Sequence, residues 1–270
     1  MASVIANLQQ KREEDSGWQF HLCLSESSVV IRLWWQSPTQ AELTRRFHDI
    51  VINDSTYNRN QYGFPLNLGI GIDNFGKSRN LWYSFHEQED VETENWVLRN
   101  HLRSAGRPPE VLCTDWMRSL ICAAQITMPL THHIYCLHHL EGNVATNLRL
   151  TLGSHWESFN GDFWALYHAV SPEAFDKLYN LLITRHPASA DYLSELYDCR
   201  DHWAWAWIST TFTAGVRTSS RVEAENRVNK LFLGLKMTFL QLFNTLNDRT
   251  SSQLTQAQIR MREVSPSSTS

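Results

Sequence analysis

The sequence predicts an α/β domain built on a mixed sheet, with a block of helices inserted late in the chain. Three strand-like runs, at residues 49–54, 64–73 and 79–87, are separated by Asn- and Gly-rich turns that join antiparallel neighbours. Two further strand-like runs, within residues 109–115 and 130–140, are each preceded by a helical segment. The resulting order, βββαβαβ, is typical of a layered α/β fold.

The other elements follow from local patterns. Residues 19–35 alternate around a Ser-rich turn and predict a hairpin, and residues 37–47 predict a short helix capped by Ser37 or Thr39. Residues 90–106 carry acids at the front and arginines at the back, and Gly106 and Pro108 mark the end of this helix. Residues 116–126 read as a helix, and residues 141–207 are helical in pattern throughout, so that their tryptophans are expected to form a core.

These patterns suggest a division of the chain into five segments. The predicted segments are an N-terminal hairpin and short helix (1–46), the first part of the sheet domain (47–140), a helical insertion (141–210), a closing helical part (211–250) and a disordered Ser-rich tail (251–270). The closing part is expected to contain a final helix at residues 221–236, after a loop at residues 213–220.

Composition limits the functional classes. The 270-residue chain is 42% hydrophobic, and its net charge of −4 provides no general attraction for nucleic acid, so contact with DNA needs a local basic patch. Its five cysteines form no paired framework, which favours a reducing compartment. No apolar run approaches the ~18 residues of a membrane span. We therefore expect a soluble, intracellular protein without a membrane partner.

Carboxylates at the ends of two predicted strands, Asp54 and Asp115, are the first candidate site. In open α/β sheets ligands bind at strand ends, and an acid from a late helix would complete a cluster there. Two-metal phosphoryl chemistry requires such a cluster, because Mg²⁺ and Mn²⁺ prefer oxygen ligands and act roughly 3.5–4 Å apart. The pattern indicates a candidate divalent-metal site.

Four stretches carry a family resemblance: "DSTYNRNQYGFPL" at Asp54, "VLCTD" at Asp115, "YCLHHLEGNV" with Cys136 and His139, and "RTSSRVEAENRVNK" with Glu223. In order and spacing they resemble the catalytic domain of Mutator-like (MULE) transposases, over residues 47–236. The resemblance implies an RNase H-like fold and a DDE-type enzyme that cuts transposon ends and joins them to target DNA in the nucleus.

By position in these motifs, the resemblance implies that Asp54, Asp115 and Glu223 are the catalytic ligands of two Mg²⁺ or Mn²⁺ ions. Trp116 follows Asp115 where the family often has a small residue, and such a bulky neighbour is expected to narrow the metal pocket. The recognition and zinc-knuckle modules that often flank this domain are not found in the sequence. A fragment, a decayed copy, or a domesticated and inactive DNA-binding derivative therefore remains an alternative.

Each acid also has a purely structural interpretation. Asp54 is compatible with a turn at the end of a strand, and Asp115 with the N-cap of the helix at residues 116–126. Ser220 and Glu223 form a capping-box pattern, and Glu225 is the substitute ligand if the helix is turned differently. An unrelated α/β interaction domain, in which the three acids lie far apart, is the third functional reading.

Two further sets of residues are candidates for binding. Cys136 and His139 have the spacing of half a zinc site, but the usual four ligands are not evident, so a buried cysteine beside a hydrogen-bonded histidine is the alternative. Basic residues around the proposed site are candidates for phosphate contacts with DNA: Arg217, Arg221, Arg227, Lys230 and Arg118. Homo-oligomerisation stays open.

Overall fold

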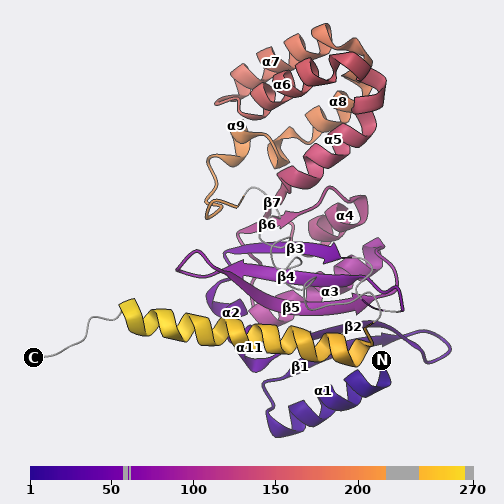
Figure 1. The fold of residues 1–270 in the computed structure, drawn as a ribbon, viewed down its shortest axis with the longest axis vertical. Helices are drawn as coiled ribbons and strands as arrows, with labels where there is room; N and C mark the ends of the chain where they lie inside the picture. Colours follow the sequence, from indigo (N-terminus) through magenta and orange to yellow (C-terminus); the bar gives the residue numbers. More distant parts are fainter. Residues whose placement is uncertain (57–59, 61, 217–236, 265–270) are drawn as a thin grey trace, which may run out of the picture.

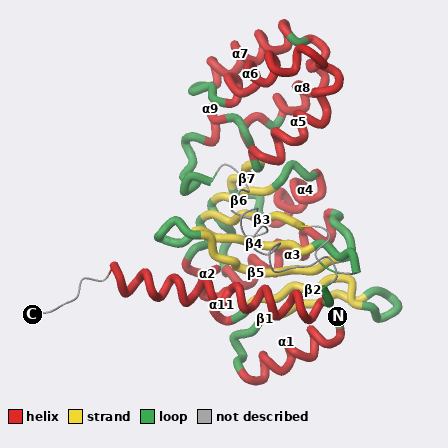
Figure 2. Tube along the Cα trace, viewed as in Figure 1, coloured by secondary structure: helices red, strands yellow, loops and turns green. Residues whose placement is uncertain are grey.

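One seven-stranded mixed sheet organises the chain in the computed structural model (Figures 1 and 2), which describes residues 1–56, 60, 62–216 and 237–264, with side chains to residue 259. From edge to edge the sheet consists of β1 (Gln19–Leu24), β2 (Val30–Gln36), β5 (Ser78–His86), β4 (Leu66–Ile72), β3 (Ile50–Thr56), β6 (Val111–Thr114) and β7 (His132–Tyr135). β6 and β7 run parallel to β3, whereas the other neighbours are antiparallel.

The strand order confirms the predicted RNase H-like class. β3, β4 and β5 form the expected antiparallel meander, and the chain then crosses to the far side of β3 through helices before adding β6 and β7. The hairpin of β1 and β2 is also present, and β2 pairs with β5 through Arg32↔His86 and Trp35↔Tyr83. The N-terminal hairpin therefore extends the same sheet.

Two helices cover one face of the sheet. α1 (Ala2–Glu14) and α11 (Phe239–Val264) lie side by side across it (Figure 1), and α11 buries Phe239, Leu242, Phe243 and Leu246 at helical spacing against the strands. α1 contributes Val4 and Leu8 to the same core.

The opposite face is covered by α3 (Val91–Ala105) and α4 (Arg118–Thr127), and α2 (Pro38–Arg46) packs near them. Ser37, one of the two predicted caps, caps α2 through a capping box with Gln40. In α3 the Asp90 side chain accepts a hydrogen bond from the Thr93 N–H at 2.8 Å, and Gly106 ends the helix at φ 79°.

A helical lobe follows β7 and lies beyond that edge of the sheet (Figure 1). It comprises α5 (Leu137–Leu152), α6 (Trp156–Tyr167), α7 (Pro172–Arg185), α8 (Ala190–Asp198) and the short α9 (Trp205–Ile208). Trp156 and Trp203 are buried in a hydrophobic core that belongs to this lobe, with Phe159, Phe163 and Phe175. The predicted helical insertion is confirmed, and Trp156 and Trp203 are core residues as expected, whereas Trp205 packs against the core of the sheet.

Three sequence expectations differ from the structure or fall outside it. α1 was not predicted, and residues 251–264 continue α11, so the expectation of disorder from residue 251 is wrong for that stretch. The predicted helix at 221–236 lies outside the described residues. Among the described helices, none is both long and apolar enough to span a bilayer.

Candidate metal and nucleic-acid site

Asp54 and Asp115 stand at matching positions on the neighbouring parallel strands β3 and β6. Ile52 pairs with Cys113, and each aspartate follows two residues later on the same side of its strand. Adjacent strands lie ≈ 4.8 Å apart, so the register brings the two carboxylates to one edge of the sheet. This is the side-chain arrangement that the sequence motifs predicted for the first two acids.

Asp54 belongs to β3, which continues to Thr56. It is 6% exposed and lies opposite Leu68 of β4. The alternative reading of Asp54 as a turn residue at the strand end is therefore wrong, because the strand and its pairing with β4 run past this position.

Asp115 follows the last residue of β6 and is only partly exposed. Burial raises its pKa, whereas His139 and the Met117 backbone N–H, which bonds to the carboxylate, act in the opposite direction. Its Oδ1 atom is buried and has no hydrogen-bond partner among the described residues. The N-cap alternative is wrong, because α4 starts after Met117, which is its N-cap.

His139, in the first turn of α5, is electrostatically linked to both aspartates. A hydrogen bond with Cys136 and the charges of Asp54 and Asp115 raise the pKa of His139 to about 9, against the opposing effect of burial. Cys136 is fully buried at the N-cap of α5. Across the described part of the chain, neither Cys136 nor His139 belongs to a group of three or more metal-ligating side chains. The structure therefore adds no third ligand to the half zinc site expected from the sequence.

Of the remaining predicted site residues, some lie within the part of the chain that the structure describes and others lie outside it. Arg118 is exposed at the first position of α4, three residues after Asp115. Trp116 packs against the helical lobe, with its ring 6.2 Å from that of Tyr192 in an edge-on arrangement. The third acid and the other basic candidates lie outside the described residues: Glu223, Glu225, Arg217, Arg221, Arg227 and Lys230.

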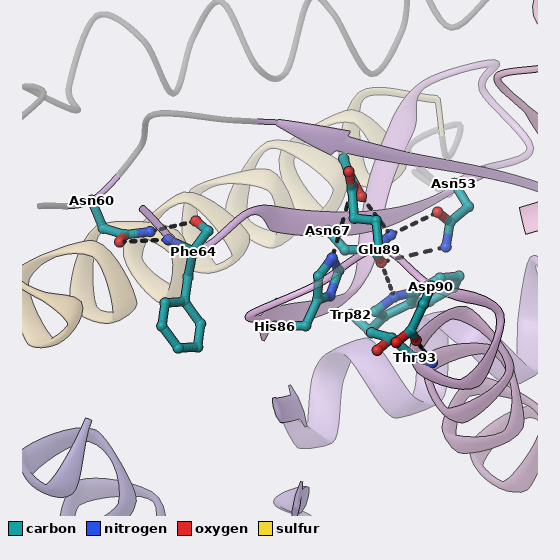
Figure 3. A network of polar contacts seen from close by, with 10 residues as sticks. Asn53, Asn60, Phe64, Asn67, Trp82, His86, Glu89, Asp90 and Thr93 are labelled. Atoms are coloured by element: carbon teal, nitrogen blue, oxygen red, sulfur yellow. Dashed lines mark hydrogen bonds and ion pairs between the residues drawn. The ribbon is translucent and has the colours of Figure 1, made fainter. Parts of the chain in front are cut away.

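The opposite face of β3 carries a buried polar network (Figure 3). Asn67 Nδ2 donates to Asn53 Oδ1 at 2.8 Å, and Trp82 Nε1 donates to Asn67 Oδ1 at 3.1 Å. Asn67 also donates to Ser55 Oγ at 3.2 Å, and Ser55 in turn bonds to Glu89. The two neighbours of Asp54 are thus fixed by hydrogen bonds, which holds this end of β3 in register.

The network ends at residues that the sequence analysis did not single out. His86, Glu89 and Glu94 lie beyond it, at the end of β5, in the following loop and in the first part of α3. The only sequence signal was the acidic stretch "HEQEDVETE", which is also the ordinary signature of a helix N-terminus.

Together, the strand order and the acids at matching positions on β3 and β6 define an RNase H-like domain. Residues 50–143, which contain both aspartates, Cys136 and His139, match the family model of the MULE transposase domain. This part of the chain is therefore similar to that family.

The chain is also similar to Arabidopsis thaliana proteins. It is 30% identical to FAR1-RELATED SEQUENCE 10 over 209 residues, which cover 77% of this chain and 30% of that protein. It is 25% identical to FAR-RED IMPAIRED RESPONSE 1 over 230 residues, covering 84% of this chain and 28% of that protein. The chain thus spans under a third of the length of these relatives.

Among solved structures, the HTLV-2 integrase catalytic core domain in complex with magnesium overlaps 51% of this chain and 84% of that chain. The sequence identity is 17% and the TM-score 0.25, an overlap that adds nothing to what the strand order establishes.

Proposed function

We propose that this chain is a DDE-type transposase domain that cleaves DNA strands and transfers them with the help of divalent metal ions. The observation that carries the proposal is the register of β3 and β6, which sets Asp54 and Asp115 side by side at one edge of the sheet. Glu223 is the proposed third acid, from its position in the family motif.

The side chains at this edge fit Mg²⁺ or Mn²⁺. Both aspartates offer oxygen ligands, and Asp115 Oδ1 is a buried acceptor without a partner among the described residues. Such ions, when bound, polarise a phosphate oxygen and increase the acidity of a coordinated water or hydroxyl group.

The protein's own residues would hold the two carboxylates in position and balance their negative charge. Asp54 is held by β3 and its polar neighbours, and the Met117 N–H orients the Asp115 carboxylate. His139 holds a proton next to both acids, which partly offsets their repulsion before DNA arrives. Arg118 is exposed three residues after Asp115, and we propose that it contacts a DNA phosphate there, with the same role for Arg217, Arg221, Arg227 and Lys230.

The proposal is tested by incubating the full chain with supercoiled plasmid and Mn²⁺, and by measuring nicking alongside DNA binding in a gel-shift assay. We expect nicking by the parent chain and at least a 100-fold lower rate for Asp115→Asn and Glu223→Gln, with DNA binding retained. Equal nicking by the parent and both variants would contradict the proposed chemistry.

A second candidate is a domesticated, nuclear DNA-binding derivative without turnover. It is favoured by the relative named FAR-RED IMPAIRED RESPONSE 1, since that name refers to a response to light and not to transposition. This function predicts DNA binding that depends on the basic residues, no nicking by the parent chain, and no effect of Asp115→Asn on DNA affinity beyond about twofold.

A further inference from the structure

His86, Glu89 and Glu94 form a compact group of potential metal ligands outside the predicted acid site. One ligand atom from each side chain lies within 4.8 Å of the others. The three residues come from the end of β5, the connecting loop and the first part of α3, so they join three successive pieces of the chain. Figure 3 shows His86 and Glu89 next to each other where the Asn53–Asn67–Trp82 network ends.

The group is buried but poorly satisfied. His86 and Glu94 are both 0% exposed. Both ring nitrogens of His86, both carboxylate oxygens of Glu94 and the Oε1 atom of Glu89 lack hydrogen-bond partners among the described residues. His86 Nε2 and Glu89 Oε1 lie 3.8 Å apart, which is too far for a hydrogen bond. Buried polar atoms normally have a hydrogen-bond partner, so these five unpaired atoms indicate that a bound group, such as an ion, completes the site.

No described basic side chain supplies that partner. Arg32, across from His86 on β2, donates instead to the exposed Glu92 at 2.8 Å. Burial, together with the charges of Glu89 and Asp115, raises the pKa of Glu94 to about 8, as expected for a buried carboxylate without a cationic partner. Burial likewise lowers the pKa of His86 to about 4.

The donor set points to a particular class of ion. Mg²⁺ and Ca²⁺ prefer oxygen ligands throughout, whereas Zn²⁺ commonly combines imidazole nitrogen with carboxylate oxygen. Three protein ligands leave a fourth position for water. The Glu89 carboxylate is also held in place by a hydrogen bond with Ser55 of β3.

We propose that His86, Glu89 and Glu94 bind a divalent transition metal of the Zn²⁺ type, at a site with its own ligands beside the Asp54–Asp115 pair. The ion would tie the end of β5 to the start of α3. It differs from the proposed catalytic metals in its ligands and in its expected preference for Zn²⁺ over Mg²⁺.

The test is a Zn²⁺ titration of the full, chelator-stripped chain against a chromophoric zinc competitor. We compare the parent with Glu94→Gln and with Glu87→Gln, a matched change at an exposed acid next to His86. Asp54→Asn and Cys136→Ser report on the two other metal sites considered for this chain. We expect one tight site in the parent, unchanged in Glu87→Gln, Asp54→Asn and Cys136→Ser, and at least tenfold weaker in Glu94→Gln.

Thermal unfolding without metal serves as the control for correct folding of the variant. The midpoint temperature of Glu94→Gln should equal or exceed that of the parent, because a neutral amide replaces an unpaired buried acid. Added Zn²⁺ should raise the midpoint of the parent but not that of Glu94→Gln. The proposal is overturned if the parent binds no Zn²⁺, if Glu94→Gln binds as tightly as Glu87→Gln, or if Asp54→Asn or Cys136→Ser abolishes binding.

Discussion

Asp54 and Asp115 each stand two residues beyond Ile52 and Cys113, which are partners in the parallel pairing of β3 with β6. This relationship depends on backbone register alone, so it is as rigid as the centre of the sheet. Residues 61 positions apart in the sequence thereby reach the same edge. It also explains why the charges of both aspartates act on the pKa of one histidine, His139.

The packing around β3 depends on a glycine. Gly69 of β4 lies opposite Trp82, and a Cβ atom there would overlap the indole ring. We expect Gly69→Ala to lower the free energy of unfolding by about 2–3 kcal/mol, through overpacking and loss of the Trp82–Asn67 hydrogen bond. Chemical denaturation measures this.

The matched control is Gly142→Ala in α5, where nothing lies within 4 Å of an added Cβ. Alanine is the better helix former, so this change should stabilise the chain by up to about 1 kcal/mol. Equal effects of the two substitutions would contradict the role given to Gly69.

A buried ion pair connects the sheet to α11. Arg79 Nη2 lies 2.7 Å from Asp73 Oδ2, and Arg79 Nη1 donates to the Gln253 carbonyl at 2.6 Å. Asp73→Asn leaves the guanidinium buried without its counter-charge, and we expect a loss of about 3–5 kcal/mol in unfolding free energy. Glu42→Gln, which removes the exposed partner of Arg46, should change it by less than about 0.5 kcal/mol. Similar losses of unfolding free energy for both variants in denaturant titrations would contradict the stabilising role given to the Arg79–Asp73 ion pair.

Acid should weaken the fold through His101. This side chain is fully buried against Trp82, with ring centroids 4.3 Å apart, and burial followed by the charge of His48 lowers its pKa to about 3. The unfolded chain then binds more protons than the folded chain below pH 6.5, so stability falls as pH falls from there toward 3. Between pH 6.5 and 5, His101 alone accounts for a loss of about 2 kcal/mol.

His101→Phe keeps an aromatic ring against Trp82 and removes the titration. The unfolding free energy of this variant should therefore fall less steeply between pH 6.5 and 5 than that of the parent, whatever its absolute stability. Parallel pH profiles for the two proteins would show that His101 does not titrate in this way.

Much of the fold could be predicted because its signals are local. Asp90 and Gly106 mark the two ends of α3, and Asn- and Gly-rich turns separate the strands of the meander. The pairing of β2 with β5 could not be predicted, since the register of Arg32 with His86 joins distant segments and leaves no local pattern. α1 was missed because only Val4 and Leu8 are buried along it, which is too few to show a helical stripe.

The candidate site divides in the same way. Asp54 and Asp115 could be predicted from the family motifs, and the structure places them at matching positions, although β3 runs past Asp54 to Thr56 and does not end there as predicted. The acids at the front of residues 90–106 are predicted to be helix-start residues, and Asp90, Glu92 and Glu94 do stand at the start of α3. Glu94 could not be distinguished from the other two in the sequence, because its burial depends on how α3 packs against the sheet.

The central claim is that the Asp54–Asp115 pair binds divalent metal, and calorimetric titration of the full chain with Mn²⁺ tests it most directly. The design compares the parent with Asp54→Asn, Asp115→Asn and the control Asp49→Asn, a half-exposed acid just before β3. We predict that Mn²⁺ affinity falls at least tenfold in the first two variants and is unchanged in the control. Mn²⁺ binding that is the same in all four proteins, or absent from the parent, would contradict the account.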